Sequence, residues 1–216
     1  MGRLIVLDGL DASGKNTQSK ILEEFLKEQN VNVKRVEYPN YASNSSALVK
    51  QYLNGEIYED LFKVNPFAAS SFYACDHYIT FEKNWKNEYF KNYVIIADRY
   101  VSSNIVHQMV KLKESEWESF IGWIYDYEIK KLGLPKEDVL IYLDVEPEVS
   151  KKLMQKRNNV KDIHEKNFNY LKSCRKAALF AAEKLNWKVL KCSDEVEIFE
   201  ISTIANKIKE LVLNII

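Results

Sequence analysis

The feature that most constrains this chain is a glycine-rich segment between a short apolar run and a helix-like run. Residues 9–17 read Gly-Leu-Asp-Ala-Ser-Gly-Lys-Asn-Thr, so the pattern G-x-x-x-x-G-K is complete from Gly9 to Lys15. The glycines allow backbone N–H groups to turn inward around phosphate oxygens, and the helix N-terminus adds its partial positive charge. Lys15 is expected to contact the β- and γ-phosphates of a nucleoside triphosphate. The sequence therefore predicts a phosphate-binding P-loop after the first strand.

Five short runs are expected to be β-strands, and helix-like segments lie between them. These runs are Leu4–Leu7, Asn32–Glu37, Tyr93–Ala97, Val139–Asp144 and Lys188–Lys191. Most are near-continuous apolar runs, which is typical of parallel strands covered on both faces. The alternation of strands and helices predicts a doubly wound α/β fold of three layers. Ligands of such sheets bind beyond the carboxyl ends of the strands.

Two helix boundaries are marked by residue type. Asn65 should cap a long helix that begins at Pro66 and runs toward Glu88, because Asn accepts from free backbone N–H groups and Pro suits the first helical turn. Gly133 and Pro135 should end another helix ahead of the fourth strand.

Composition favours one folded domain, 1–216, without a charge bias. Of the 216 residues, 46% are apolar, and Lys plus Arg equals Asp plus Glu at 31 each. A neutral balance gives no general field for nucleic acid. No apolar run approaches the ~20 residues that span a bilayer, and the first residues are not expected to form a signal peptide. The cysteines Cys75, Cys174 and Cys192 lack metal-like spacing, so reduced thiols and a cytoplasmic location are expected.

A carboxylate and a guanidinium follow the third strand as Asp98 and Arg99. Asp98 should face the P-loop across the sheet and hold the water shell of Mg²⁺, while Arg99 offers a planar fork for phosphate. The residue after Lys15 is usually Ser or Thr, which binds Mg²⁺. Here Asn16 takes that position and the hydroxyl comes one residue later at Thr17. Either Thr17 reaches the metal, or water and carboxylates replace it.

Taken together, these residues resemble the thymidylate kinase family, within the nucleoside-monophosphate kinases. The resemblance covers essentially the whole chain. It includes 9–18, Tyr38-Pro39, Ser71-Phe72-Tyr73-Ala74-Cys75-Asp76, Asp98-Arg99-Tyr100-x-x-Ser103-Asn104, Leu143-Asp144-Val145 before Pro147, and Asp162-x-x-Glu165. The resemblance implies that ATP and dTMP give ADP and dTDP, with Mg²⁺, for dTTP synthesis. It also implies a P-loop kinase fold with a five-stranded parallel sheet and a short lid, usually as a homodimer.

Site residues carry over from the family by position. Asp11 would lie near the sugar 3′-hydroxyl and the metal, Tyr73 would stack on thymine, and Arg99 would hold the acceptor phosphate. Residues expected to bind ATP are Gly9, Leu10, Asp11, Ala12, Ser13, Gly14, Lys15, Asn16 and Thr17, with Arg157. Residues expected to bind dTMP are Asp11, Tyr38, Tyr73, His77, Arg99, Tyr100, Ser103, Asn104 and Gln108. The catalytic set is Lys15, Arg99, Arg157 and Asp11, and the metal candidates are Thr17, Asp98, Asp11 and Glu165.

The polar stretch around 156–164 is the expected lid. Family members can carry an arginine in the P-loop just before Ser13, but this chain has Ala12 there. Arg157 is the only arginine of the stretch, so it is expected to close over ATP and stabilise the transferring phosphoryl group. Asp162 and Glu165 would orient basic residues or reach the metal's water shell. Ser193 and Asp194, beyond the last strand, could border the adenine.

Two departures leave the choice of monophosphate open. Asn40 stands where many relatives carry Arg, and His77 stands where the family commonly places Arg near the acceptor phosphate. Histidine is only partly charged at neutral pH.

Two other functions compete with the main expectation. A deoxynucleoside kinase would need a carboxylate base after the second strand, where Tyr38-Pro39-Asn40 follows Glu37 instead. A nucleotide-binding regulatory module with weak or no turnover is the other alternative.

Overall fold

The computed structural model describes residues 1–156 and 168–215. Its strands are β1 (Arg3–Gly9), β2 (Val33–Glu37), β3 (Val94–Asp98), β4 (Val139–Asp144) and β5 (Lys188–Lys191). Its helices are α1 (Lys15–Glu28), α2 (Ala47–Leu53), α3 (Pro66–Thr80), α4 (Lys86–Phe90), α5 (Val101–Met109), α6 (Trp117–Ile124), α7 (Pro147–Lys156), α8 (Phe168–Leu185) and α9 (Ile201–Leu213). Two π-helical segments, Phe81–Trp85 and Tyr125–Lys131, continue α3 and α6. All five predicted strands are confirmed within two residues at each end.

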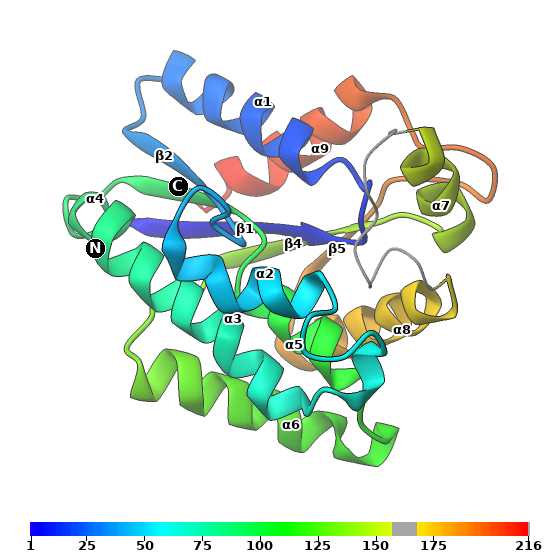
Figure 1. Ribbon diagram of the computed structural model, residues 1–216. Helices are drawn as coiled ribbons and strands as arrows, with labels where there is room; N and C mark the ends of the chain where they lie inside the picture. Colours follow the sequence, from blue (N-terminus) through cyan, green and yellow to red (C-terminus); the bar gives the residue numbers. More distant parts are fainter. Residues whose placement is uncertain (157–167, 216) are drawn as a thin grey trace.

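The strands form a parallel sheet in the order β2-β3-β1-β4-β5 (Figure 1). The registers pair Leu7 of β1 with Asp98 of β3, and Gly9 of β1 with Leu143 of β4. The carboxyl ends of the three central strands therefore meet at one edge of the sheet. The P-loop leaves β1 at this edge, which is where ligands of doubly wound sheets bind.

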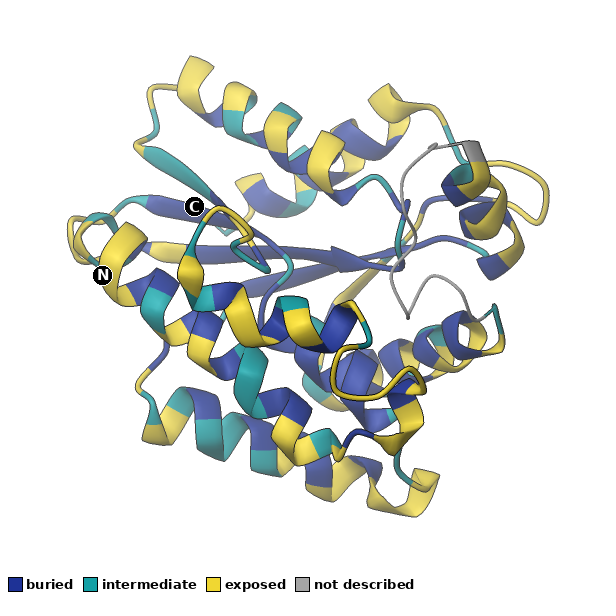
Figure 2. Ribbon diagram, viewed as in Figure 1, coloured by how far each residue is buried: buried dark blue, intermediate teal, exposed yellow. Residues whose placement is uncertain are grey.

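Helices cover both faces of the sheet, so the predicted three-layer α/β fold is confirmed. Figure 1 shows α1 and α9 on one face and α3, α5, α6 and α8 on the other. Alternate residues of β1 point to the two sides: Ile5 and Leu7 join the core under α1 and α9, and Leu4 and Val6 join the other core. The central strands β1, β3 and β4 are almost entirely buried, whereas the edge strands β2 and β5 are partly exposed (Figure 2).

The predicted helix boundaries are also confirmed. The Asn65 side chain accepts hydrogen bonds from the N–H groups of Phe67 and Ala68, and Pro66 is the first residue of α3. Gly133 adopts a φ of +71°, which suits the left-handed turn that ends the π-helical segment after α6. Glu37 is the last residue of β2, as expected.

The lid predicted at 156–164 lies outside the described residues, apart from Lys156, which ends α7. Arg157, Asp162 and Glu165 lie outside them as well. Among the described helices, none combines the length and the apolarity that crossing a membrane requires.

Candidate active site

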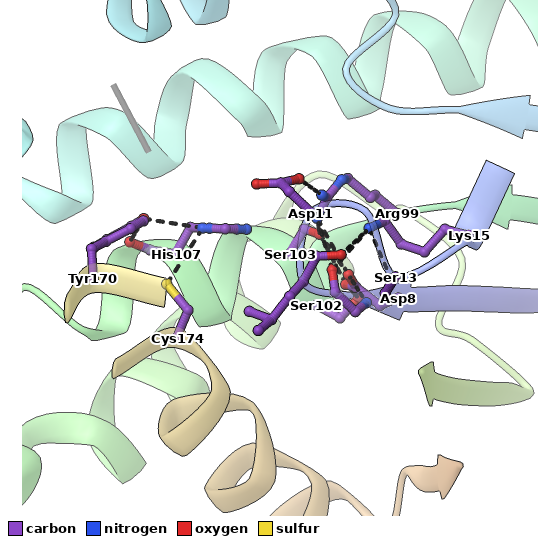
Figure 3. Close-up of polar contacts among 12 residues, drawn as sticks. Asp8, Asp11, Ser13, Lys15, Arg99, Ser102, Ser103, His107, Tyr170 and Cys174 are labelled. Carbon is purple, nitrogen blue, oxygen red and sulfur yellow. Dashed lines mark hydrogen bonds and ion pairs between the residues drawn. The ribbon is translucent and has the colours of Figure 1, made fainter. Parts of the chain in front are cut away.

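The P-loop forms a turn in which backbone groups surround a small space at the start of α1. Gly14 precedes α1 with a φ of +91°, and Gly9 has a φ of +156°. A Cβ at Gly9 would lie 2.6 Å from both the Leu143 carbonyl oxygen and the Ser13 hydroxyl, so only glycine fits there. Figure 3 shows Lys15 and Ser13 side by side within this turn. The predicted phosphate cradle thus has the required backbone shape.

Lys15 is buried within the cradle and bonds to the loop itself. Its Nζ donates to the carbonyl oxygens of Gly9 at 3.0 Å and Leu10 at 2.7 Å, and to the Ser13 hydroxyl at 3.4 Å. Burial, and secondly the positive charge of Arg99, lower the pKa of Lys15 to about 8, although Asp11 raises it in part. A phosphate group entering the cradle would relieve both the burial penalty and the repulsion.

Asp8 and Arg99 join the P-loop to the start of α5. Arg99 has a φ of +67°, and its guanidinium forms an ion pair with Asp11 and donates to the Ser103 hydroxyl at 3.0 Å (Figure 3). The buried Asp8 carboxylate accepts from the hydroxyls of Ser102 and Ser103 and from the Gly9 N–H. Asp8 was not among the predicted site residues. The one feature of the sequence that could have indicated it is its position, as a carboxylate at the end of an apolar strand.

A cavity opens beside Arg99 and contains most of the side chains predicted to bind the acceptor. Its lining is Asp11, Tyr38, Pro39, Tyr41, Leu53, Tyr73, His77, Arg99, Tyr100, Ser103 and His107. Seven of these eleven residues, all but Pro39, Tyr41, Leu53 and His107, were predicted from the sequence. Below, we call this space the acceptor cavity. A cationic end at Arg99 and aromatic walls elsewhere suit a nucleotide that carries one phosphate group.

Three of the residues predicted to bind dTMP lie at different depths. His77 lines the acceptor cavity but is buried, with Nδ1 only 2.6 Å from a carboxylate oxygen of Glu128. Asn104 does not line the cavity, and its amide nitrogen donates to the Ser70 carbonyl oxygen and to Glu128. Gln108 is fully buried and also does not line the cavity. Glu128 comes from the π-helical segment after α6, and no sequence motif indicated it.

His107 is a further residue that sequence analysis missed. It lies one helical turn after Ser103, and its Nδ1 is 3.0 Å from the Tyr170 hydroxyl and 3.6 Å from Cys174 Sγ (Figure 3). Burial lowers the pKa of His107 to about 4. The ring is therefore neutral at physiological pH. His107 adds a polar but uncharged group to the wall of the acceptor cavity.

An apolar cavity lies on the other side of the P-loop. It is bounded by Ala12, Ser13, Gly14, Thr17, Gln18, Leu153, Ile198, Phe199, Ile201 and Ile204. Ser193 and Asp194, expected to border the adenine, do not line it. Asp194 instead accepts from the N–H groups of Val196 and Glu197 in its own turn. The lining comes from three separate parts of the chain, so no local pattern could have identified it.

Asp98 places a carboxylate near the charges of Lys15 and Arg99. Its carboxylate is largely buried, and it forms no hydrogen bond or ion pair with another residue of 1–156 or 168–215. Burial raises the pKa of Asp98, while the nearby charges of Lys15 and Arg99 lower it in part. In the same part of the chain, no group of three or more His, Cys, Asp or Glu side chains could hold a metal. Mg²⁺ commonly uses one or two carboxylates together with substrate phosphates and water, and this arrangement fits that pattern.

The two residues after Lys15, Asn16 and Thr17, have side chains that point to different neighbours. Asn16 is exposed and donates to Glu37 of β2 at 3.2 Å, so it joins α1 to β2 rather than entering the cradle. Thr17 is exposed and borders the apolar cavity. Among the predicted residues, the structure thus brings together the P-loop, Asp98, Arg99 and the acceptor-cavity side chains. Arg157 and Glu165 cannot be placed relative to them, since they lie outside the described residues.

Comparisons with known proteins point to one family. A family model described as thymidylate kinase matches residues 7–202. Putative thymidylate kinase 251L of Invertebrate iridescent virus 6 is 32% identical over 152 residues, covering 66% of this chain and 60% of the relative. The thymidylate kinase of Plasmodium falciparum is 30% identical over 152 residues, covering 68% of this chain and 63% of the relative. The match thus spans less than two thirds of the length of either relative.

Solved structures agree with the fold. The structure of thymidylate kinase from Candida albicans superposes with a TM-score of 0.75 at 18% identity, covering 99% of this chain and 92% of that one. The thymidylate kinase structure from Ehrlichia chaffeensis gives a TM-score of 0.65 at 19% identity, covering 98% of each chain.

Proposed function

Because this chain belongs to the thymidylate kinase family, we propose that it transfers the γ-phosphoryl group of ATP to dTMP, giving ADP and dTDP for dTTP synthesis. The observation that carries the proposal is the placement of Arg99. Its guanidinium lies between the P-loop and the acceptor cavity, paired with Asp11 and bonded to Ser103. An acceptor phosphate held by this fork would face the γ-phosphate held at Lys15, as in-line transfer requires.

The chain's own groups have separate tasks in this proposal. The P-loop N–H groups and Lys15 bind the triphosphate, and the apolar cavity between Leu153 and Phe199 takes the adenine. Asp11 turns from Arg99 toward the acceptor sugar when the acceptor phosphate replaces it. Tyr73 stacks on the base. Arg157, outside the described residues, is proposed to cover the transferring group.

Mg²⁺ is part of the same proposal. The ion, when bound, neutralises charge that develops on the phosphate oxygens. Asp98 is the residue proposed to hold it through its water shell, because its carboxylate lies at the cradle without a partner among the described residues. Thr17, Asp11 and Glu165 are the further candidates.

One assay tests the proposed reaction together with the two alternative functions, a deoxynucleoside kinase and a regulatory module. ADP formation is measured with ATP and Mg²⁺, using dTMP, other monophosphates and thymidine as acceptors. Turnover with dTMP and not with thymidine supports the proposal. Turnover with thymidine alone would indicate a deoxynucleoside kinase. ATP binding without ADP formation on any acceptor would indicate a regulatory module.

The cytoplasmic location and the homodimer are also proposals. The homodimer follows from the resemblance to the family. Light scattering after size-exclusion chromatography measures the molar mass directly. A mass near 25.3 kDa at micromolar concentration would contradict a dimer, and one near twice that value would support it.

A further inference from the structure

Lys111 is a half-buried lysine whose amino group lies on a buried tyrosine. It follows α5 by two residues, and its Nζ donates to the Tyr52 hydroxyl at 2.9 Å and to the Val64 carbonyl oxygen at 3.4 Å. Nζ also lies 4.7 Å from the centroid of the Tyr52 ring, and Tyr52 is fully buried. Lys111 itself is intermediate in exposure, so part of it still meets solvent.

No opposite charge compensates an ammonium group at this place. Within the described part of the chain, no carboxylate forms an ion pair with Lys111, whereas Lys34, for example, pairs with a glutamate. The two acceptors of Lys111, a phenol and a peptide carbonyl, are both neutral. Removing an ammonium group from water without a counter-charge favours the neutral amine. Burial accordingly lowers the pKa of Lys111 to about 7, although Cys174 raises it in part.

The hydrogen bonds of Lys111 leave the lone pair of a neutral amine available. Such an amine has two hydrogens, and the Tyr52 hydroxyl and the Val64 carbonyl oxygen accept one each. The lone pair then points away from both acceptors. A desolvated, neutral amine is the form in which lysine acts as a nucleophile. The partial exposure of Lys111 admits small electrophiles to this nitrogen.

Lys15 also has a lowered pKa, about 8, but its contacts differ from those of Lys111. Its Nζ donates to three acceptors, the carbonyl oxygens of Gly9 and Leu10 and the Ser13 hydroxyl, so it uses three hydrogens. Only the ammonium form supplies three hydrogens, and that form has no lone pair. Of these two lysines, Lys111 is therefore the one whose contacts suit a nucleophile.

We propose that Lys111 is a covalent modification site, which small acyl phosphates acylate at Nζ. The lone pair of the neutral amine forms an N–C bond to the acyl carbon, and the C–O bond to the phosphate group breaks. Inorganic phosphate leaves with the electron pair of that bond and takes up the proton that the amine releases. The product is an uncharged amide, which keeps one N–H for Tyr52 but loses the cation–π contact with its ring. Because the Tyr52 ring meets Tyr73 edge-on at 6.2 Å, the modification lies beside the acceptor cavity.

The test compares Lys111 with Lys113, an exposed lysine two residues further along the chain. The wild-type chain is incubated with acetyl phosphate at pH 7, and mass spectrometry of its peptides gives the initial acetylation rate at each lysine. About half of the Lys111 amines are neutral at this pH, against fewer than about one in a thousand amines of fully solvated lysines. A weaker base is also a weaker nucleophile, so we expect Lys111 to react at least about tenfold faster rather than in full proportion. Equal rates, or a faster Lys113, would overturn the proposal, because exposure alone favours Lys113.

Two further measurements on the wild-type chain separate burial from local sequence. From pH 7 to pH 9 the rate at Lys111 should increase no more than about twofold, whereas the rate at Lys113 should keep rising with pH. Parallel increases would overturn the proposal. In concentrated urea the preference for Lys111 should disappear, because the unfolded chain exposes both amines to water. A preference that persists in urea would come from the neighbouring residues in the sequence and would also overturn it.

The variant Lys111→Arg confirms which residue is modified. Arginine keeps a positive charge on the Tyr52 ring but offers no amine of this kind, so acetylation of the peptide should fall to the level of Lys113 alone. Undiminished acetylation of that peptide in Lys111→Arg would place the modification elsewhere and contradict the proposal. These rates require no nucleotide, so the outcome is independent of whether the chain phosphorylates dTMP.

Discussion

The unusual environment of Lys15 predicts that ATP affinity depends on pH. In the unliganded chain the ammonium group is buried beside Arg99, and its pKa falls from 10.5 to about 8. A bound triphosphate stabilises the charged form, so binding must recharge any Lys15 that has lost its proton. At pH 9, one unit above this pKa, only about a tenth of the unliganded chains carry the charge. The Kd for ATP should therefore rise about tenfold between pH 7 and pH 9.

The lowered pKa of Lys15 also makes the stability of the unliganded fold depend on pH, and proton linkage gives the direction of that dependence. The unfolded chain keeps the Lys15 proton up to about pH 10.5, whereas the folded, unliganded chain loses it near pH 8. Between these values the unfolded state binds more protons, so the contribution of Lys15 to the stability of the unliganded fold rises with pH. Below pH 8 the buried charge costs on the order of 3 kcal/mol, and ATP binding offsets that cost.

Titration calorimetry at saturating Mg²⁺ measures both quantities. Experiments at pH 7, 8 and 9, each in two buffers of different ionisation enthalpy, give the Kd and the protons taken up, expected to approach about 0.9 per ATP at pH 9. Lys15→Met should bind ATP weakly and lose the pH dependence. Lys111, whose pKa burial lowers to about 7, remains in this variant and serves as the internal control. An unchanged Kd in wild type, or the same tenfold rise in Lys15→Met, would refute the reasoning.

Three further predictions concern the acceptor cavity and the metal. Arg99→Lys should raise KM for dTMP at least about tenfold, because an ammonium cannot replace the bidentate fork; steady-state kinetics with an unchanged KM would contradict that role. Tyr73→Ala should weaken dTMP binding by about 1–3 kcal/mol. The control Tyr78→Ala, at an exposed position of the same helix, should leave dTMP binding unchanged, and equal effects of the two substitutions would argue against stacking. Asp98→Asn should increase the Mg²⁺ concentration needed for half-maximal activity at fixed ATP, and an identical Mg²⁺ dependence would remove Asp98 from the metal site.

Features that depend on near neighbours in the chain could be predicted from the amino-acid sequence alone. The P-loop was readable because its glycines and Lys15 act within seven residues, and the strands because each is a short uninterrupted run. Asn65 and Gly133 marked helix ends because capping is local. The family resemblance extended this reading to Tyr73 and Arg99, which now line one cavity.

Tertiary structure alone decided which distant groups meet. Arg99 pairs with Asp11 across 88 residues, and Glu128 reaches His77 across 51. The periods of helices and strands relate only residues that are close in the sequence, so no sequence pattern could predict either contact. These contacts arise when α3, α5 and the segment after α6 pack on the same face of the sheet. The orientation of the Asn16 side chain also depends on tertiary structure. Its amide donates a hydrogen bond to Glu37 at the end of β2, which keeps the amide out of the phosphate cradle.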